Sequence, residues 1–114
     1  MIRQTSEFKA TTVSNLRGGK GDLGREDIFT PEEMLGKAEW CIVLTIPAGC
    51  SIGEHPHGPD AEIYLMLSGT LRITDDGVTK DLTAGDTVFT GGGKVHSVEN
   101  VSGKDAKMLA VKLP

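Results

Sequence analysis

The chain has 114 residues, of which 38% are hydrophobic and 25% charged, and with a net charge of −4 it is typical of one globular domain. Its 12 basic residues are scattered and only 4% of residues are aromatic, which argues against a nucleic-acid-binding surface. No apolar run approaches the ~20 residues of a membrane helix, and the first residues lack the apolar segment of a secretory signal. We therefore expect a cytoplasmic protein without membrane association, whose cysteines Cys41 and Cys50 are free thiols.

The N-terminal part of the chain predicts a strand, an irregular loop and a short helix. Residues 7–13 (EFKATTV) are strand-like, whereas residues 15–22 (NLRGGKGD) are rich in glycine and predict no regular element. A helix is predicted to begin after Thr30, because Thr30 is a favourable N-cap and Glu33 completes a capping box. Gly36 is expected to end this helix after about one and a half turns.

The remaining residues, 40–114, predict a succession of short strands. Many of the 15 glycines separate apolar segments of four to eight residues, and Asp76-Gly77 is a hairpin-turn signal. We expect about eight strands, a number typical of a β-sandwich or barrel, at residues 40–46, 51–57, 62–67, 70–74, 78–82, 87–90, 95–99 and 108–113. Residues 1–39 are expected to pack on this barrel.

Two of the three histidines, His55 and His57, lie two residues apart, and Glu62 follows five residues later. Side chains two apart on a strand point to the same face, so both imidazoles can approach one ion, and Glu62 can face the same space from the next strand. Neutral imidazoles and carboxylates are metal ligands, and His96 is the one histidine left to complete the set. Pro56 lacks an N–H for a sheet ladder, which predicts an edge, a bulge or a barrel end.

The spacing around these residues resembles the first signature of the cupin family. From Gly49, five residues lead to His55, one to His57, four to Glu62 and six to Gly69. All positions of that signature are matched.

A second segment resembles the second cupin signature. From Gly85, five residues lead to Gly91, followed by Gly93, His96 and Asn100. Gly91 stands where the family usually has proline, which predicts a flexible approach to His96. Together the two signatures include every histidine of the chain, and the resemblance covers roughly its last two thirds.

The resemblance implies an all-β fold, a cupin-type jelly-roll β-barrel, with one divalent transition metal inside it. Its ligands are implied to be His55, His57, Glu62 and His96, an arrangement that leaves open coordination positions for water or substrate. Mixed nitrogen and oxygen ligands suit manganese, iron, nickel, cobalt or zinc, and the sequence does not choose among them. The alternative interpretation is that these are ordinary polar side chains at barrel ends, satisfied by backbone hydrogen bonds.

Four further side chains are candidates for lining a substrate pocket. Tyr64 and Met66 share the inward parity of Glu62, and the other two candidates are Val98 and Trp40. The alternative for each of them is a place in the hydrophobic core.

The sequence also resembles a group of small single-domain bacterial cupins called oxalate-decarboxylase-like, in residues 15–21, 51–53 and 96–100. This implies a metal-dependent protein acting on a small carboxylate or sugar acid, as a decarboxylase, isomerase or oxygenase. The alternatives are non-catalytic binding or sensing of such a molecule, and a vestigial or structural site. Neither signature contains an arginine or an identifiable proton donor. Single-domain cupins usually pair, so the resemblance also implies a homodimer, with residues 7–13 available to a neighbouring sheet.

Overall fold

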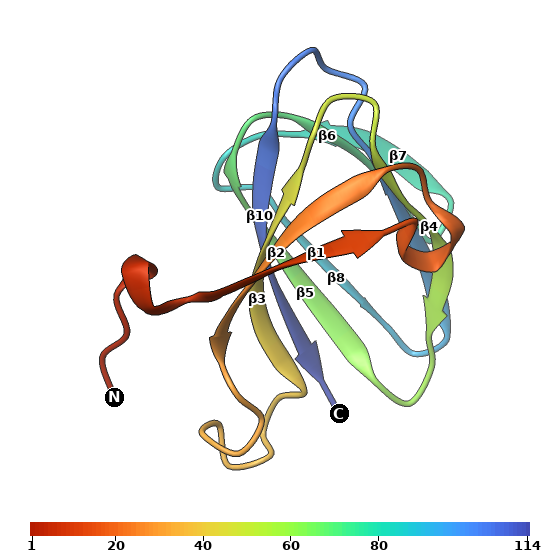
Figure 1. Cartoon of the computed structure of the whole chain (residues 1–114). Helices are drawn as coiled ribbons and strands as arrows, with labels where there is room; N and C mark the ends of the chain where they lie inside the picture. The colour runs from red at the N-terminus through yellow and green to blue at the C-terminus, as the bar shows by residue number, and fades with distance from the viewer.

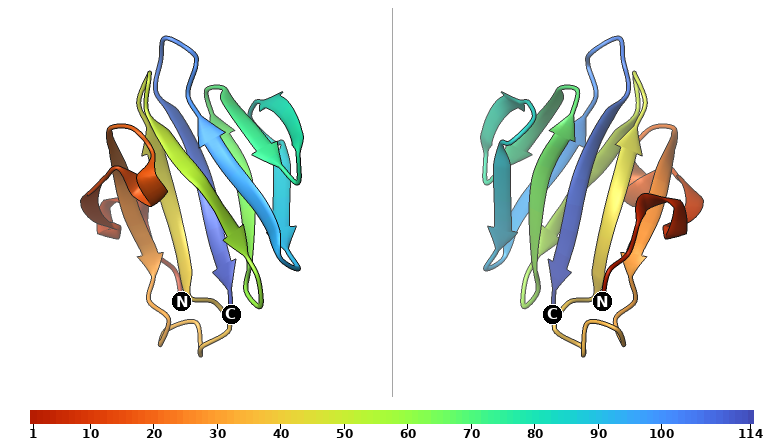
Figure 2. Two further views of the ribbon diagram at one scale, coloured as in Figure 1. Left: turned by 90° about the vertical axis from the view of Figure 1, so that its right-hand side faces the viewer. Right: turned by 90° about the vertical axis from the view of Figure 1, so that its left-hand side faces the viewer.

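The computed structural model of the protein describes all of residues 1–114. Ten strands form two antiparallel sheets that lie face to face (Figures 1 and 2). One sheet has six strands in the order β1-β2-β3-β10-β5-β8, and the other has four in the order β4-β9-β6-β7. The strands are β1 (Lys9–Ser14), β2 (Asp22–Phe29), β3 (Trp40–Ile46), β4 (Ser51–His57), β5 (Ala61–Ser68), β6 (Leu71–Asp75), β7 (Val78–Leu82), β8 (Thr87–Gly91), β9 (Lys94–Glu99) and β10 (Ala106–Leu113).

The hydrophobic core lies between the two sheets. Alternate side chains of a strand point to one face, and on β3 these are Ile42, Leu44 and Ile46, all buried. The core cluster contains 13 buried residues contributed by both sheets. The all-β jelly roll expected from the sequence is therefore confirmed, and it places the inner faces of β4, β5 and β9 around one end of the core.

All eight strands expected from residue 40 onward are present, with ends that differ by at most two residues. The predicted hairpin turn joins β6 to β7, and both of its central residues take the left-handed conformation, with φ of 49° at Asp76 and 79° at Gly77. The expected N-terminal strand is β1, which pairs with β2 of the same chain.

Strand β2 is absent from the predicted elements. It pairs with β3 on its other side, so that β1 and β2 extend the six-stranded sheet at one side of the molecule, opposite the β6–β7 hairpin (Figure 2). Its sequence, DLGREDIF, contains four charged residues and a glycine, so residue propensities alone do not identify it as a strand.

The helix predicted after Thr30 is not formed. The capping box is present, because the Glu33 N–H donates to Thr30 Oγ1 and the Thr30 N–H donates to Glu33 Oε1. However, Leu35 and Gly36 both have positive φ, 56° and 69°, so the chain leaves the helical conformation after a single turn and residues 31–36 form consecutive turns. The helical elements of the chain are two 3-10 turns, η1 (Thr5–Glu7) and η2 (Leu16–Gly18).

Candidate metal centre

A β-bulge on β4 turns the two neighbouring histidines into the core. Ile52 pairs with Val98 and His55 pairs with His96, so three steps along β4 match two along β9. The extra residue restores an inward direction for His55 after the inward Ile52, and His57 follows it on the same face. β4 is an edge strand of its sheet, which is where proline is tolerated. This confirms the position inferred from Pro56.

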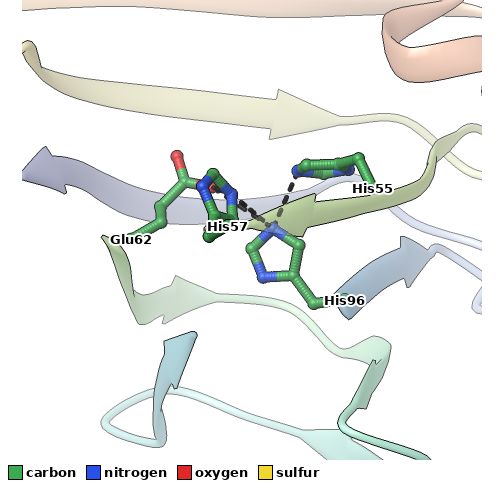
Figure 3. Close-up of side chains that lie close together, drawn as sticks. All are labelled: His55, His57, Glu62 and His96. Atoms are coloured by element: carbon green, nitrogen blue, oxygen red, sulfur yellow. Dashed lines mark hydrogen bonds and ion pairs between the residues drawn. The ribbon is translucent and has the colours of Figure 1, made fainter. Parts of the chain in front are cut away.

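Four side chains from three strands meet at this end of the core (Figure 3). They are His55 and His57 on β4, Glu62 on β5 and His96 on β9, all buried. Their nearest ligand atoms lie within 4.8 Å of one another. The Nε2 atom of His96 is 2.8 Å from His55 Nε2 and 3.1 Å from His57 Nε2.

The outer ring nitrogen of each imidazole has a hydrogen-bond acceptor. His55 Nδ1 donates to the carbonyl oxygen of Gly53 at 2.7 Å, and His57 Nδ1 donates to a carboxylate oxygen of Asp60 at 2.6 Å. These two acceptors carry no proton of their own. The Nδ1 atoms of both rings are therefore protonated, which leaves a lone pair on each Nε2 atom.

His96 has the same tautomer for a related reason. Its Nδ1 lies 2.9 Å from Thr90 Oγ1, and the Thr90 hydroxyl donates its only proton to Asp75. Thr90 Oγ1 must then accept a hydrogen bond from the N–H of His96 Nδ1. Such outer contacts fix the orientation and the basicity of metal-binding histidines.

The donor atoms of this cluster fit a divalent transition metal. Three Nε2 lone pairs and the Glu62 carboxylate converge on one point, and without a cation between them they repel. Ligand atoms about 2.0–2.2 Å from one ion are roughly 3 Å apart in octahedral geometry. The observed separations include 3.1 Å from His57 Nε2 and 3.3 Å from His96 Nε2 to Glu62 Oε1. The four side chains could therefore hold such an ion.

The environment of the cluster keeps its ligands in the protonation states that metals bind. Burial lowers the pKa of the His55 imidazole, which favours the neutral ring. Burial acts to raise the pKa of the Glu62 carboxyl, but its polar contacts with His96 and Tyr64 outweigh burial and hold that pKa below its usual value. The pKa of Tyr64 is raised well above its usual value, chiefly by burial, so its hydroxyl, 3.2 Å from His96 Nε2, keeps its proton.

A cavity of about 60 Å³ opens beside the cluster and is lined mostly by apolar side chains. Tyr64 and Trp40, two of the four pocket candidates, line it together with His55, His57 and Glu62. The other two candidates, Met66 and Val98, are not among its lining residues and belong to the hydrophobic core.

Two arginines also line this cavity, and sequence reasoning missed both. Arg25 lies on β2 and is paired with Asp27 at 3.0 Å. Arg17 lies in η2 and, unlike Arg3, Arg25 and Arg72, has no acidic partner. Both precede the two signatures, so the spacing of the signatures carries no signal for them.

Two glycines allow the loop that carries Arg17 to lie directly on β4. A Cβ atom on Gly53 would lie 2.0 Å from the carbonyl oxygen of Arg17, and one on Gly19 would lie 2.2 Å from that of Ser51. Hydrogen bonds between Lys20 and Ser51 fasten the loop further. Arg17 itself has a φ of 55°, an unfavourable conformation for a residue other than glycine and one that recurs at functional sites.

Comparison with protein families matches residues 42–112 to the cupin domain. The chain belongs to the cupin family. An oxalate-binding protein of Thermotoga maritima is 37% identical over 111 residues, which is 97% of this chain and 92% of that protein.

Solved structures of cupins share the fold. The crystal structure of a predicted oxalate decarboxylase from Thermotoga maritima matches with a TM-score of 0.94 and 36% identity, over 99% of this chain and 98% of that chain. An RmlC-like cupin from Shewanella frigidimarina matches with a TM-score of 0.75 over 97% of this chain and 87% of that chain. At 18% identity, the second match shows only that the fold is shared. None of the helical elements is long and apolar enough to cross a membrane.

Proposed function

We propose that this cupin binds one divalent transition metal through His55, His57, Glu62 and His96, and uses it to hold a small carboxylate. The main support for a carboxylate ligand is that Arg17, an arginine without an acidic partner, lines the cavity beside the cluster. When bound, a transition metal supplies Lewis acidity to an oxygen ligand. Manganese, iron, nickel, cobalt and zinc all suit the donor set.

The size of the cavity favours the smallest acids. A cavity needs about 10–15 Å³ to hold one water molecule, which is one non-hydrogen atom. A cavity of about 60 Å³ therefore has room for about four to six non-hydrogen atoms. Oxalate has six, whereas a sugar acid has about twice as many and would extend beyond the cavity. The name of the Thermotoga relative, an oxalate-binding protein, supports the same choice of ligand.

Binding without turnover is the better-supported form of this function. The acid–base groups that line the cavity are His55, His57 and Glu62, all assigned to the metal, and Tyr64. No imidazole or carboxyl of the cavity lining is left to transfer a proton. The second candidate is an enzyme, as a decarboxylase, isomerase or oxygenase, and the observation in its favour is that the buried Tyr64 hydroxyl retains its proton beside the cluster.

Calorimetric titration of metal-loaded protein with oxalate tests this proposal. A charge-assisted hydrogen bond contributes about 1.5–3 kcal/mol, so we expect Arg17→Met to weaken oxalate binding about 10- to 150-fold. The matched control is Arg72→Met, which removes an arginine that pairs with Asp81 across β6 and β7 and does not line the cavity, and it should leave the affinity unchanged. Failure of the metal-loaded wild type to bind oxalate or any other small acid would contradict the proposal.

Assays for formate and carbon dioxide separate the two forms of the function. If the protein only binds oxalate, neither product accumulates at a stoichiometric excess of substrate. If it is an enzyme, product accumulates, and Tyr64→Phe removes turnover while oxalate still binds.

We also propose that two copies pair through the outer face of the six-stranded sheet. Ile63, Leu67 and Phe89 are 37%, 43% and 63% exposed on this sheet, and Ile63 pairs across strands with both Phe89 and Val111. Two-fold pairing brings the same patch of both copies together. The cross-strand row of Phe89, Ile63 and Val111 contains no charged residue, so a second copy can cover it without burying a charge. Light scattering should give a dimer for the wild type and a monomer for Phe89→Lys, and a monomeric wild type refutes the pairing.

A cytoplasmic location is part of the proposal. Both cysteines, Cys41 and Cys50, are free, and unpaired thiols persist in reducing compartments. Cell fractionation with an antibody against the protein should recover it with cytoplasmic markers.

A further inference from the structure

Four side chains form one row across the inner face of the six-stranded sheet. Lys112 on β10 pairs with Trp40 on β3 and with Glu62 on β5, and Glu62 pairs with Thr90 on β8. Register partners of an antiparallel sheet project to the same face. One row therefore brings a proposed metal ligand and three neighbours to the same end of the core.

Within this row, a hydrogen bond from Trp40 makes the two carboxylate oxygens of Glu62 inequivalent. The Trp40 indole Nε1–H donates a hydrogen bond to Glu62 Oε2 at 3.0 Å. The other oxygen, Oε1, is the one that lies near the imidazole nitrogens, 3.1 Å from His57 Nε2 and 3.3 Å from His96 Nε2. Only one carboxylate oxygen is thus directed at the centre of the cluster.

The indole is itself held in place. The guanidinium carbon of Arg25 lies 5.4 Å from the Trp40 ring centroid, and Lys112 Nζ lies 4.7 Å from it. Both distances are within the range of cation–π attraction. Arg25 is fixed in turn by its ion pair with Asp27, so the N–H that reaches Glu62 belongs to a ring with restricted freedom.

We propose that Trp40 is a positioning residue that restricts Glu62 to one-oxygen binding of the metal. The coordination position that the second oxygen would occupy then stays open for the small carboxylate. This inference rests on the metal binding proposed above and deepens it, because it names the residue that keeps the site accessible to a chelating ligand.

Lys112 acts on a second ligand from the same row. Its Nζ lies 3.5 Å from Asp60 Oδ2, the oxygen that accepts the hydrogen bond of His57 Nδ1. Lys112 also pairs with Glu39 at 2.8 Å. It therefore fixes the carboxylate that orients His57, while its ammonium group faces the ring that orients Glu62.

The direct test is Trp40→Phe, which keeps a ring between the two cations and removes the N–H donor. The measurement is the infrared spectrum of the metal-loaded protein minus that of the metal-free protein. Carboxylate bands that are present in this difference spectrum for the wild type and absent for Glu62→Gln belong to Glu62. We expect the wide separation of symmetric and antisymmetric stretches of a one-oxygen ligand in the wild type, and a narrower separation in Trp40→Phe. Loss of an outer contact weakens metal affinity about 10- to 100-fold, and we expect oxalate binding to the loaded variant to weaken at least tenfold as the open position is filled.

A matched pair on β10 provides an independent test. The Lys112 side chain lies on the inner face of the sheet, in the row with Trp40 and Glu62, whereas Lys107 on the same strand is exposed. Lys112→Met should weaken metal binding at least tenfold, and Lys107→Met should not change it. This pair decides the inference if Trp40→Phe does not fold, as judged by circular dichroism of the metal-free protein.

The outcomes separate this inference from the proposed function. If the wild type binds no metal, the proposed function fails. If the wild type binds metal and oxalate, but Trp40→Phe leaves the carboxylate bands and both affinities unchanged, the assignment of Trp40 alone is overturned. Lys112 contacts both the Trp40 ring and Asp60, so equal metal affinities of Lys112→Met and Lys107→Met overturn the role of the row in holding Glu62 and His57.

Discussion

Replacement of Gly53 by alanine tests the link between the N-terminal loop and the cavity. The new Cβ atom would lie 2.0 Å from the carbonyl oxygen of Arg17, 2.9 Å from its carbon and 3.0 Å from the nitrogen of Gly19. All three are backbone atoms, which no side-chain rotation can move. For the shortest contact to reach the ordinary 3.4 Å, the loop must retreat from β4 by about 1.4 Å.

The expected cost follows from the size of that displacement. Overpacking typically destabilises a protein by about 1–3 kcal/mol. Because the new Cβ atom is fixed to the backbone of β4 and the atoms that it meets are backbone atoms of the loop, we expect Gly53→Ala to lower the free energy of unfolding by about 2–3 kcal/mol. Arg17 moves with the loop, so oxalate binding should weaken about tenfold or more, by loss of a charged hydrogen bond. Metal affinity should change much less, because the four ligands lie on β4, β5 and β9.

Urea unfolding and calorimetry measure the two effects on the same variants. Gly103→Ala is the matched control, because nothing lies within 4 Å of a Cβ atom there and its φ is not positive. Gly19→Ala should also destabilise, and the double variant Gly19→Ala/Gly53→Ala should cost less than the sum of both, since one retreat of the loop relieves both clashes. If Gly53→Ala unfolds at the same urea concentration as Gly103→Ala and binds oxalate like the wild type, the reasoning is refuted.

Three further predictions concern the supports of the site and the fold. Thr90→Val removes the acceptor of His96 Nδ1 and should weaken metal binding about 10- to 100-fold; an unchanged affinity in a metal titration would show that this contact is dispensable. Chelation of the metal should increase hydrogen exchange near residues 91–96 first, and exchange that stays constant there would argue against His96 as a ligand. The Arg3 hydrogen bond lowers the pKa of Glu33 to about 2, so its stabilising effect is present above the usual carboxyl pKa and is lost as pH falls toward 2. The melting-temperature difference between wild type and Arg3→Met should therefore be largest at neutral pH and shrink in acid, and a difference independent of pH contradicts this.

The strands of the barrel were predictable because local chemistry and tertiary packing agree there. On β3, alternating apolar residues such as Ile42 and Leu44 both favour a strand and fill the core. On β2 the two disagree. Arg25 and Asp27 project toward the cavity side of the sheet as an ion pair, and only the neighbouring strands β1 and β3 make this charged segment a strand.

The side chains of the candidate metal centre were predictable from spacing, but their directions were not. His55 and His57 share a face because they are two residues apart, whereas the bulge that points them into the core is visible only in the pairing of β4 with β9. Thr90, Asp75 and Asp60, which fix the imidazoles, carry no motif of their own.

The arginines of the cavity were unpredictable for another reason. Arg17 reaches the cavity because Gly19 and Gly53 allow two backbone segments to touch. That contact joins parts of the chain more than thirty residues apart. Met66 points inward, as its shared parity with Glu62 predicts, but parity does not separate the cavity wall from the closed core, to which both Met66 and Val98 belong.

Titration of metal-stripped protein with manganese, cobalt and zinc ions tests the central claim most directly. We expect the wild type to take up one equivalent of metal per chain. We also expect loss of that uptake in His96→Ala, a variant whose sheet structure should persist by circular dichroism. A wild type that takes up none of these ions, or a folded His96→Ala that binds them as tightly as the wild type, would contradict the claim that these four side chains form a metal site.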